Sequence, residues 1–120
     1  MGVIGRFVSA SLQVEGVHQW DDAPEQVGYL RYPHRHMFHI EVHVQVFHND
    51  RDTEIIQLKQ KVRKYLAEKY YLEDWSLCNF GRMSCEMIAE ELCIELKLER
   101  CSVKEDGENG GVIIYKHSSK

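Results

Sequence analysis

Three histidines of this chain have the residue type and the spacing of metal ligands. His34 and His36 are separated only by Arg35, and they open an apolar, alternating segment with the pattern of a β-strand. Alternate side chains of a strand point to the same side and lie roughly 7 Å apart, so both imidazoles can reach one metal ion. His18 closes an earlier alternating run, and two such strands would bring all three imidazoles to one end of a sheet. The set predicts a three-histidine zinc site with its fourth position open.

The strand that follows this pair has two different faces. One face is apolar and the other is polar, the latter formed by His39, Glu41, His43 and Gln45. We interpret His39 and His43 as part of a polar face that lines a barrel or a subunit contact, rather than as a second metal site. The competing interpretation of His18, His34 and His36 is that two are surface histidines and one is a core histidine.

The rest of the pattern predicts two helices between two pairs of strands. Apolar residues recur at helical spacing from Ile55 to about Lys69, and a second helix begins near Ser84, a residue type favoured at helix N-caps. The first strand is either continuous or broken by a bulge near Ser9-Ala10-Ser11. The expected segments are a strand over 3–17, a loop over 19–33, a strand over 37–47, a helix over 55–69, a connector over 70–82, a helix from 84, a strand over 101–105, a turn over 106–111 and a strand over 112–116.

This β-β-α-α-β-β order predicts an α+β fold in a single domain over residues 1–120. The expected architecture is an antiparallel four-stranded sheet with both helices on one face. Such a sheet has two open edges, which proteins usually cover or pair. Edges that join between subunits are one solution.

Composition and charge exclude several classes of protein. The chain has 120 residues, 43% of them hydrophobic and 28% charged, which is typical of one globular domain. The formal net charge is -4 and there is no basic run, so binding to nucleic acid is not supported. The amino terminus lacks the apolar core of a signal peptide and no stretch has the length of a membrane span. We therefore expect a cytoplasmic protein that does not bind membranes.

The four cysteines indicate free thiols rather than a disulfide framework. Cys78, Cys85, Cys93 and Cys101 are spaced without a C-x-x-C pair. In a chain without a secretory signal, buried thiols are the expected state of such residues.

The pattern resembles the 6-pyruvoyl-tetrahydropterin synthase and 6-carboxytetrahydropterin synthase family over nearly the whole chain. Residues 17–18 (VH) and 34–38 (HRHMF) resemble the two segments that supply that family's three zinc ligands. Residues 54–59 (EIIQLK) resemble its Asp-Phe-x-x-Leu-Lys helix start, and residues 83–89 (MSCEMIA) resemble its Pro-Thr-x-Glu-x-x-Ala helix start. Glu105 falls where the family has a glutamate that grips the amino-pyrimidine edge of a pterin.

The resemblance implies a fold, an assembly and an activity. The fold is the T-fold, in which sheets of several subunits join into a barrel, here a homo-hexamer of two stacked trimers with sites between subunits. Zinc would be held by His18, His34 and His36, and a pterin or purine-like small molecule would be bound by Glu105 and Ser84. The implied reaction converts dihydroneopterin triphosphate to a 6-substituted tetrahydropterin, in tetrahydropterin or queuosine biosynthesis. Glu108 is the alternative to Glu105 if the turn lies further along the chain.

The chain also departs from the family in its proton-transfer residues. The family's loop cysteine has no counterpart in residues 19–33, where Glu25 is the one glutamate. The family's Leu-Asp-His-x-x-Leu motif corresponds to residues 72–77 (LEDWSL), with Asp74 in place of histidine. Glu25 and Asp74 are the candidate proton-transfer residues, and the Cys78 thiol is a further one. Arg35, in place of the family's glycine, narrows the site or contacts an anionic ligand.

These departures leave two alternatives to an enzyme open. One is a catalytically lapsed T-fold protein that binds a pterin or a nucleobase without turnover. The other is a structural or interaction protein in which the histidines are incidental.

Overall fold

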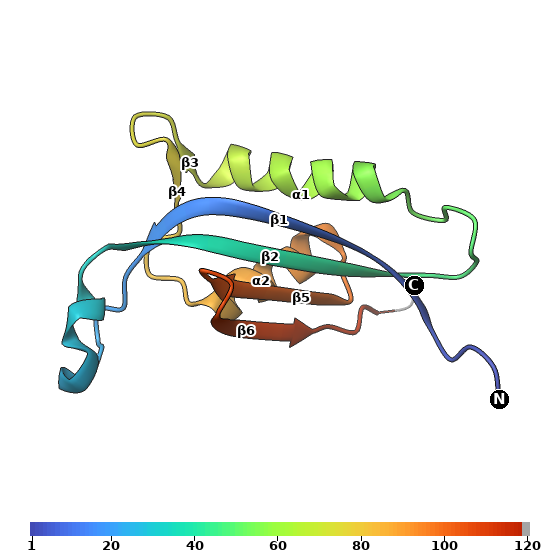
Figure 1. Cartoon of the computed structure of the whole chain (residues 1–120), viewed down its shortest axis with the longest axis horizontal. Coiled ribbons are helices and arrows are strands. Elements are labelled where there is room, and N and C mark those ends of the chain that lie inside the picture. The colour runs from blue at the N-terminus through green and yellow to red at the C-terminus, as the bar shows by residue number, and fades with distance from the viewer. Residues whose placement is uncertain (119–120) are drawn as a thin grey trace.

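The computed structural model describes residues 1–118, which form one α+β unit (Figure 1). The sequence predicts one domain over residues 1–120, and residues 119 and 120 lie outside the described residues. The elements in chain order are β1 (Arg6–His18), the 3₁₀ helix η1 (Glu25–Arg31), β2 (His34–Val46), α1 (Ile55–Lys69), β3 (Tyr71–Leu72), β4 (Leu77–Asn79), α2 (Cys85–Leu96), β5 (Arg100–Glu105) and β6 (Asn109–Ile114).

The sheet has six strands in the described residues, in the order β3-β4-β1-β2-β5-β6. All neighbours are antiparallel except β1 and β4, which are parallel. The expected four-stranded sheet is therefore wrong, because the connector over 70–82 contains β3 and β4. Strands of two and three residues are too short to show an alternating pattern in the sequence.

The long hairpin of β1 and β2 is continuous. Its register runs without interruption from Arg6 opposite Val46 to His18 opposite His34. The alternative of a bulge near Ser9-Ala10-Ser11 is therefore wrong. Ala10 is buried while Ser9 and Ser11 are exposed, as the pleat of an unbroken strand requires.

Both α-helices pack into the same core as one face of the sheet. In Figure 1 α2 lies behind the strands and α1 runs along β1. The buried residues of β2, α1 and α2 belong to one cluster, and each side chain buried there contributes roughly 1.5–3 kcal/mol to folding. Examples from these three elements are Phe38, Ile40, Val42, Leu58, Val62, Leu66, Ile88, Leu92 and Leu96. The opposite face of the sheet is open and carries polar side chains at its centre, such as Gln13, Glu41 and Lys104.

Each α-helix begins at a side-chain cap. The Glu54 carboxylate accepts hydrogen bonds from the backbone N–H groups of Ile56 and Gln57, both at 2.9 Å, and these bonds lower its pKa. The Ser84 hydroxyl accepts from the N–H of Met87 at 3.2 Å and starts α2, as expected from the sequence. The Ser84 cap places the first turn of α2 beside the end of β5.

Several boundaries differ from those expected, among them those of the first strand, which runs over Arg6–His18 rather than 3–17. The loop over 19–33 contains η1, and β2 begins at His34 rather than at Met37. β6 begins at Asn109 because the turn after Glu105 is only three residues long, with Asp106 and Gly107 at φ 56° and 74°.

Two expectations about the surface and the thiols can be compared with the structure. All four cysteines are free and buried, as predicted. No helix within residues 1–118 is long and apolar enough to cross a membrane.

Candidate metal centre

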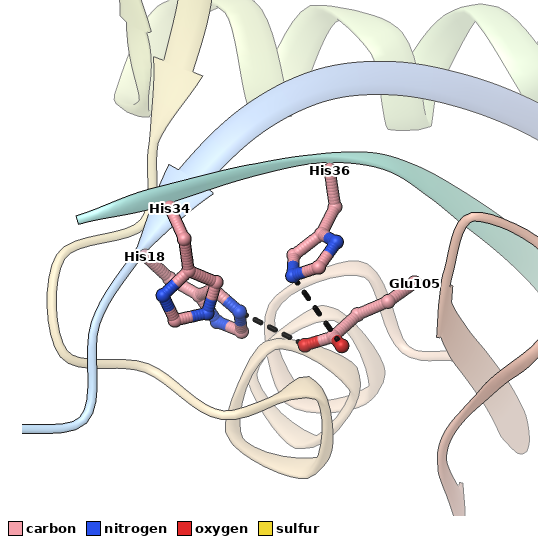
Figure 2. Close-up of side chains that lie close together, drawn as sticks. All are labelled: His18, His34, His36 and Glu105. Carbon is pink, nitrogen blue, oxygen red and sulfur yellow. Dashed lines mark ion pairs between the residues drawn. The ribbon is translucent and has the colours of Figure 1, made fainter. Parts of the chain in front are cut away.

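Four side chains converge at the end of the β1–β2 hairpin, where β5 also ends (Figure 2). They are His18, His34, His36 and Glu105, and one potential ligand atom from each lies within 4.8 Å of all the others. The imidazole centroids are 4.5 Å apart for His18 and His34 and 5.1 Å apart for His34 and His36. The structure therefore brings together the three histidines that the sequence singled out, and it adds Glu105 to them.

Strand register explains why these residues meet. His18 pairs with His34 across the hairpin, and His36 lies two residues further along β2, on the same side. β5 pairs with β2 along the edge that faces away from β1, and its last residue, Glu105, lies opposite Phe38. Gly16 lies opposite His36, and its lack of a side chain leaves room for the aromatic rings below the site.

Backbone carbonyls set the tautomers of two of the imidazoles. Nδ1 of His18 lies 2.8 Å from the carbonyl oxygen of Met83, and Nδ1 of His34 lies 2.9 Å from that of Tyr32. A carbonyl oxygen only accepts hydrogen bonds, so Nδ1 carries the proton in both rings. In a neutral ring Nε2 then has a free lone pair, which is the form that binds a metal ion.

A carboxylate sets the tautomer of His36. Nδ1 of His36 donates to Oδ2 of Asp106 at 2.8 Å, while Oδ1 of Asp106 accepts from the backbone N–H of Met37 at 3.0 Å. The bond from Met37 and the bond from His36 lower the pKa of Asp106, which is therefore ionised at neutral pH. A carboxylate–histidine pair of this kind commonly orients a metal ligand and raises its basicity.

The Nε2 nitrogens of two imidazoles face the Glu105 carboxylate. Nε2 of His18 lies 2.9 Å from Oε2 of Glu105, and Nε2 of His36 lies 3.4 Å from Oε1. Both nitrogens are buried and have no hydrogen-bond partner. Burial lowers the pKa of His18, more than the Met83 carbonyl and Glu105 raise it, so the neutral ring is favoured. A carboxylate this close to two Nε2 atoms calls for a positive charge among them, which a bound metal ion would supply.

A metal ion fits this arrangement. The donor set is three imidazole nitrogens and one carboxylate oxygen, all of which are ligand types that zinc accepts. Ligand atoms around tetrahedral zinc are roughly 3.3 Å apart when Zn–N bonds are about 2.0–2.1 Å, close to the nitrogen–oxygen distances at Glu105. The chain can thus hold a metal ion through His18, His34, His36 and Glu105.

A pocket of about 460 Å³ lies next to the four side chains. His18, His34 and Glu105 form part of its wall, so a bound molecule would contact the metal ligands directly. Cys85, at the start of α2, also lines it, with Sγ 3.8 Å from Oε2 of Glu105. Burial and the nearby Glu105 and Glu86 raise the pKa of Cys85 to about 12, so its thiol is protonated at neutral pH. The other walls include Trp20, Leu30, Arg82, Met83 and Met87.

The other residues singled out by the sequence lie in different places. Ser84 lines the pocket, but its hydroxyl caps α2. Glu25 is exposed at the start of η1, and Asp74 is exposed between β3 and β4; neither lines the pocket. Cys78 is buried within β4. Arg35 pairs with Glu15 at 2.6 Å, on the opposite face of the strands from the histidines.

Sequence reasoning missed the groups that orient the imidazoles and the thiol of the pocket. Asp106 directly follows Glu105, and this position beside a predicted site residue was the one indication in the sequence that Asp106 could orient an imidazole. The carbonyl oxygens of Tyr32 and Met83 leave no mark in the sequence, because every residue has a carbonyl. Cys85 gave no signal of its own, because a cysteine at the start of a helix is usually a core residue.

Comparisons with known proteins do not assign this chain to a family. No family model matches its sequence, and no curated protein matches it.

Proposed function

We propose that this protein is a zinc-dependent enzyme of the 6-pyruvoyl-tetrahydropterin synthase type. Its proposed substrate is dihydroneopterin triphosphate or a related pterin, and its proposed fold is the T-fold, assembled as a hexamer. The observation that carries the proposal is that the Nδ1 atoms of three imidazoles are hydrogen-bonded to oxygen acceptors, which leaves their Nε2 atoms available for a metal ion beside a pocket of ligand size. The sequence resemblance supplies the substrate class.

In this proposal different residues bind the metal ion, orient its ligands and exclude water. Zinc, when bound, supplies a Lewis acid that polarises a substrate oxygen and acidifies neighbouring C–H bonds. His18, His34 and His36 hold the ion, with orientations set by Met83, Tyr32 and Asp106. The apolar wall of the pocket excludes water from a bound heterocycle.

Glu105 has two candidate roles in this proposal. Its two oxygens can accept a pair of parallel N–H bonds from an amino-pyrimidine, as the resemblance implies. In the structure the same oxygens face His18 and His36. Binding of a heterocycle by Glu105 therefore requires the carboxylate to turn away from the imidazoles.

Proton transfer is assigned to Glu25 or Asp74 on the same basis. Both carboxylates are exposed and outside the pocket of their own chain. In an assembly with sites between subunits, a neighbouring copy would bring one of them to the pocket.

The experiment that tests the proposal is incubation of zinc-loaded protein with dihydroneopterin triphosphate. Mass spectrometry then identifies bound ligand and products. We expect a 6-substituted tetrahydropterin from the wild-type protein and none from His34→Ala. His43→Ala is the matched control, because His43 lies on the same strand with its side chain on the opposite face and does not line the pocket. Substrate that is neither bound nor changed would refute the proposal.

A second candidate function is binding of a pterin or purine-like ligand without turnover. The absence of a cysteine from residues 19–33 and the high pKa of the Cys85 thiol favour it, since the described pocket holds no cysteine that is ionised at neutral pH. Intact substrate retained on the zinc-loaded protein would identify this function. Purified protein without metal, together with a His18→Ala variant unchanged in folding and ligand binding, would instead indicate a structural or interaction role.

A further inference from the structure

A second hollow lies on the polar, open face of the sheet. Its volume is about 500 Å³, and it shares no lining residue with the pocket at the metal centre. Three cationic side chains line it, Lys59 and Arg63 from α1 and Lys104 from β5. Hydrogen-bonding side chains of β1 and β2, among them Ser11, Gln13 and His39, lie between them.

Strand register and helix position build this hollow. Gln13 pairs with His39, and His39 pairs with Lys104, so these three side chains stand in one row across β1, β2 and β5. α1 runs along β1 (Figure 1). Lys59 and Arg63 are four residues apart on α1, so they lie on the same side of the helix. The cations therefore come from α1 on one side and β5 on the other, with the side chains of β1 and β2 between them.

The cations of the hollow have no internal counter-charge. In the part of the chain that the structure describes, no carboxylate oxygen lies within ion-pair distance of Lys59, Arg63 or Lys104. Glu41 is the one acidic residue of the lining, and it lies 3.9 Å from Arg100, which is outside the hollow. The net charge of the whole chain is -4, so this local excess of positive charge runs against the average of the molecule.

We propose that the hollow on the open sheet face binds a phosphorylated small molecule, with its phosphate groups held by Lys59, Arg63 and Lys104. Arginine offers paired N–H donors to phosphate oxygens and lysine a compact charge. The hydroxyl of Ser11 and the amide of Gln13 add neutral donors to the same ligand. A volume of about 500 Å³ is within the range of small-molecule sites and accommodates a ligand of nucleotide size. The site is separate from the metal centre and does not depend on the function proposed for it.

The test is isothermal titration calorimetry with two probes, inorganic triphosphate and ATP. Both probes chelate metal ions, so the titrations use metal-free protein and are repeated with His34→Ala to exclude binding at the metal centre. We expect saturable binding of at least one probe, at about 50 mM salt, that weakens as salt screens the charges. Tighter binding of ATP identifies a nucleotide-like ligand, and equal binding identifies the phosphate chain as the recognised group.

Single substitutions make the result specific to the hollow. Arg63→Gln and Lys104→Gln should each weaken binding roughly tenfold, the loss expected for one charge-assisted contact. Lys64→Gln is the matched control, because Lys64 is the exposed neighbour of Arg63 on α1 and does not line the hollow. Circular dichroism confirms that each variant is folded. No saturable binding of either probe, equal losses in Lys64→Gln, or binding abolished by His34→Ala but retained in Arg63→Gln and Lys104→Gln would overturn the proposal.

Discussion

At the scale of single residues, each imidazole of the metal centre is oriented by a different oxygen acceptor. Two acceptors are main-chain carbonyls, of Met83 and Tyr32, and the third is the Asp106 carboxylate. Carbonyls hold a ring in place without adding charge, whereas Asp106 adds a negative charge that compensates a bound cation. The three rings are therefore oriented alike for metal binding but differ in their electrostatic surroundings.

Glu105→Gln tests whether the Glu105 carboxylate binds the metal ion or anchors the pterin. If Glu105 binds the ion, the neutral amide should weaken zinc affinity by roughly tenfold or more, because a charged ligand is lost. Competition with a chromophoric chelator measures this affinity. Glu108→Gln is the control, since Glu108 is exposed in the adjacent turn. Unchanged zinc affinity with weaker pterin binding would show that Glu105 is an anchor only.

At the scale of elements, the hairpin of β1 and β2 depends on a close contact at Gly16. A Cβ atom at this position would lie 2.7 Å from Cε2 of Phe80 and 3.1 Å from Cδ2 of Phe38. These two rings are themselves 5.0 Å apart in an edge-to-face arrangement beneath the imidazoles. The position opposite His36 must therefore lack a side chain if the two phenylalanine rings are to pack beneath the imidazoles.

Gly16→Ala should lower the free energy of unfolding by about 1–3 kcal/mol, the usual cost of overpacking a core. Urea unfolding measures the change, and a loss of zinc affinity should accompany it, because the Phe38 and Phe80 rings must shift. Gly28→Ala is the control, since a Cβ there would approach no atom closer than 3.7 Å. Equal stability of the two variants would contradict the close contact.

A second element-scale feature joins α1 to α2 through one carboxylate. Oε2 of Glu91 on α2 accepts hydrogen bonds from the hydroxyls of Tyr65 and Tyr70 and from the ammonium of Lys69. Burial of Glu91 raises its pKa, but the hydrogen bonds from Lys69, Tyr70 and Tyr65 together lower the pKa by more, so the net shift is downward. Tyr70 also contacts the sulfur of Met83 at 3.5 Å, which connects this network to the residue that orients His18.

Glu91→Gln should remove a pH-dependent part of the stability. Because the pKa of Glu91 is lower in the folded state, its contribution is complete above the unfolded value of 4.5 and is lost as the pH falls through the folded value. We expect the variant to be less stable than wild type by about 1–2 kcal/mol at neutral pH, and the difference to shrink below pH 4.5. Urea unfolding over a pH series measures both, with Glu90→Gln, exposed on α2, as the control. A pH-independent difference would contradict the assigned cause.

At the scale of the whole molecule, the sheet has edges that one copy of the chain does not pair. Within the described residues, β1 pairs with β4 only at Gly16 and Val17, and β6 pairs only with β5. Apolar side chains are exposed near these edges, with Ile114 of β6 80% exposed and Phe7 of β1 53% exposed. Unpaired edges with apolar side chains favour association of strands between copies.

Ile114→Lys should therefore shift the protein toward smaller species, because a charge on the β6 edge opposes pairing with another strand. Sedimentation velocity at micromolar concentration measures the size distribution of the wild type and the variant. Ile94→Lys is the control, since Ile94 is also exposed but lies on α2 rather than on a strand. A monomeric wild type would contradict both this prediction and the proposed hexamer.

The sequence by itself determined the parts of this protein that depend on local periodicity. Alternation placed His34 and His36 on one side of a strand, and helical spacing located α1 and α2, because these patterns follow from backbone geometry over a few residues. β3 and β4 escaped prediction because two or three residues carry no measurable period. β4 joins the sheet by pairing with β1, and β3 joins it by pairing with β4.

The tertiary structure alone decided how the metal centre is completed. The oxygen that orients His18 lies 65 residues away along the chain, and the one that orients His36 lies 70 residues away. Glu105 reaches the imidazoles only because β5 pairs with β2 in a particular register. A one-residue slip of that pairing would turn Glu105 to the opposite face of the sheet, so its place in the site depends on long-range packing rather than on its own sequence neighbours.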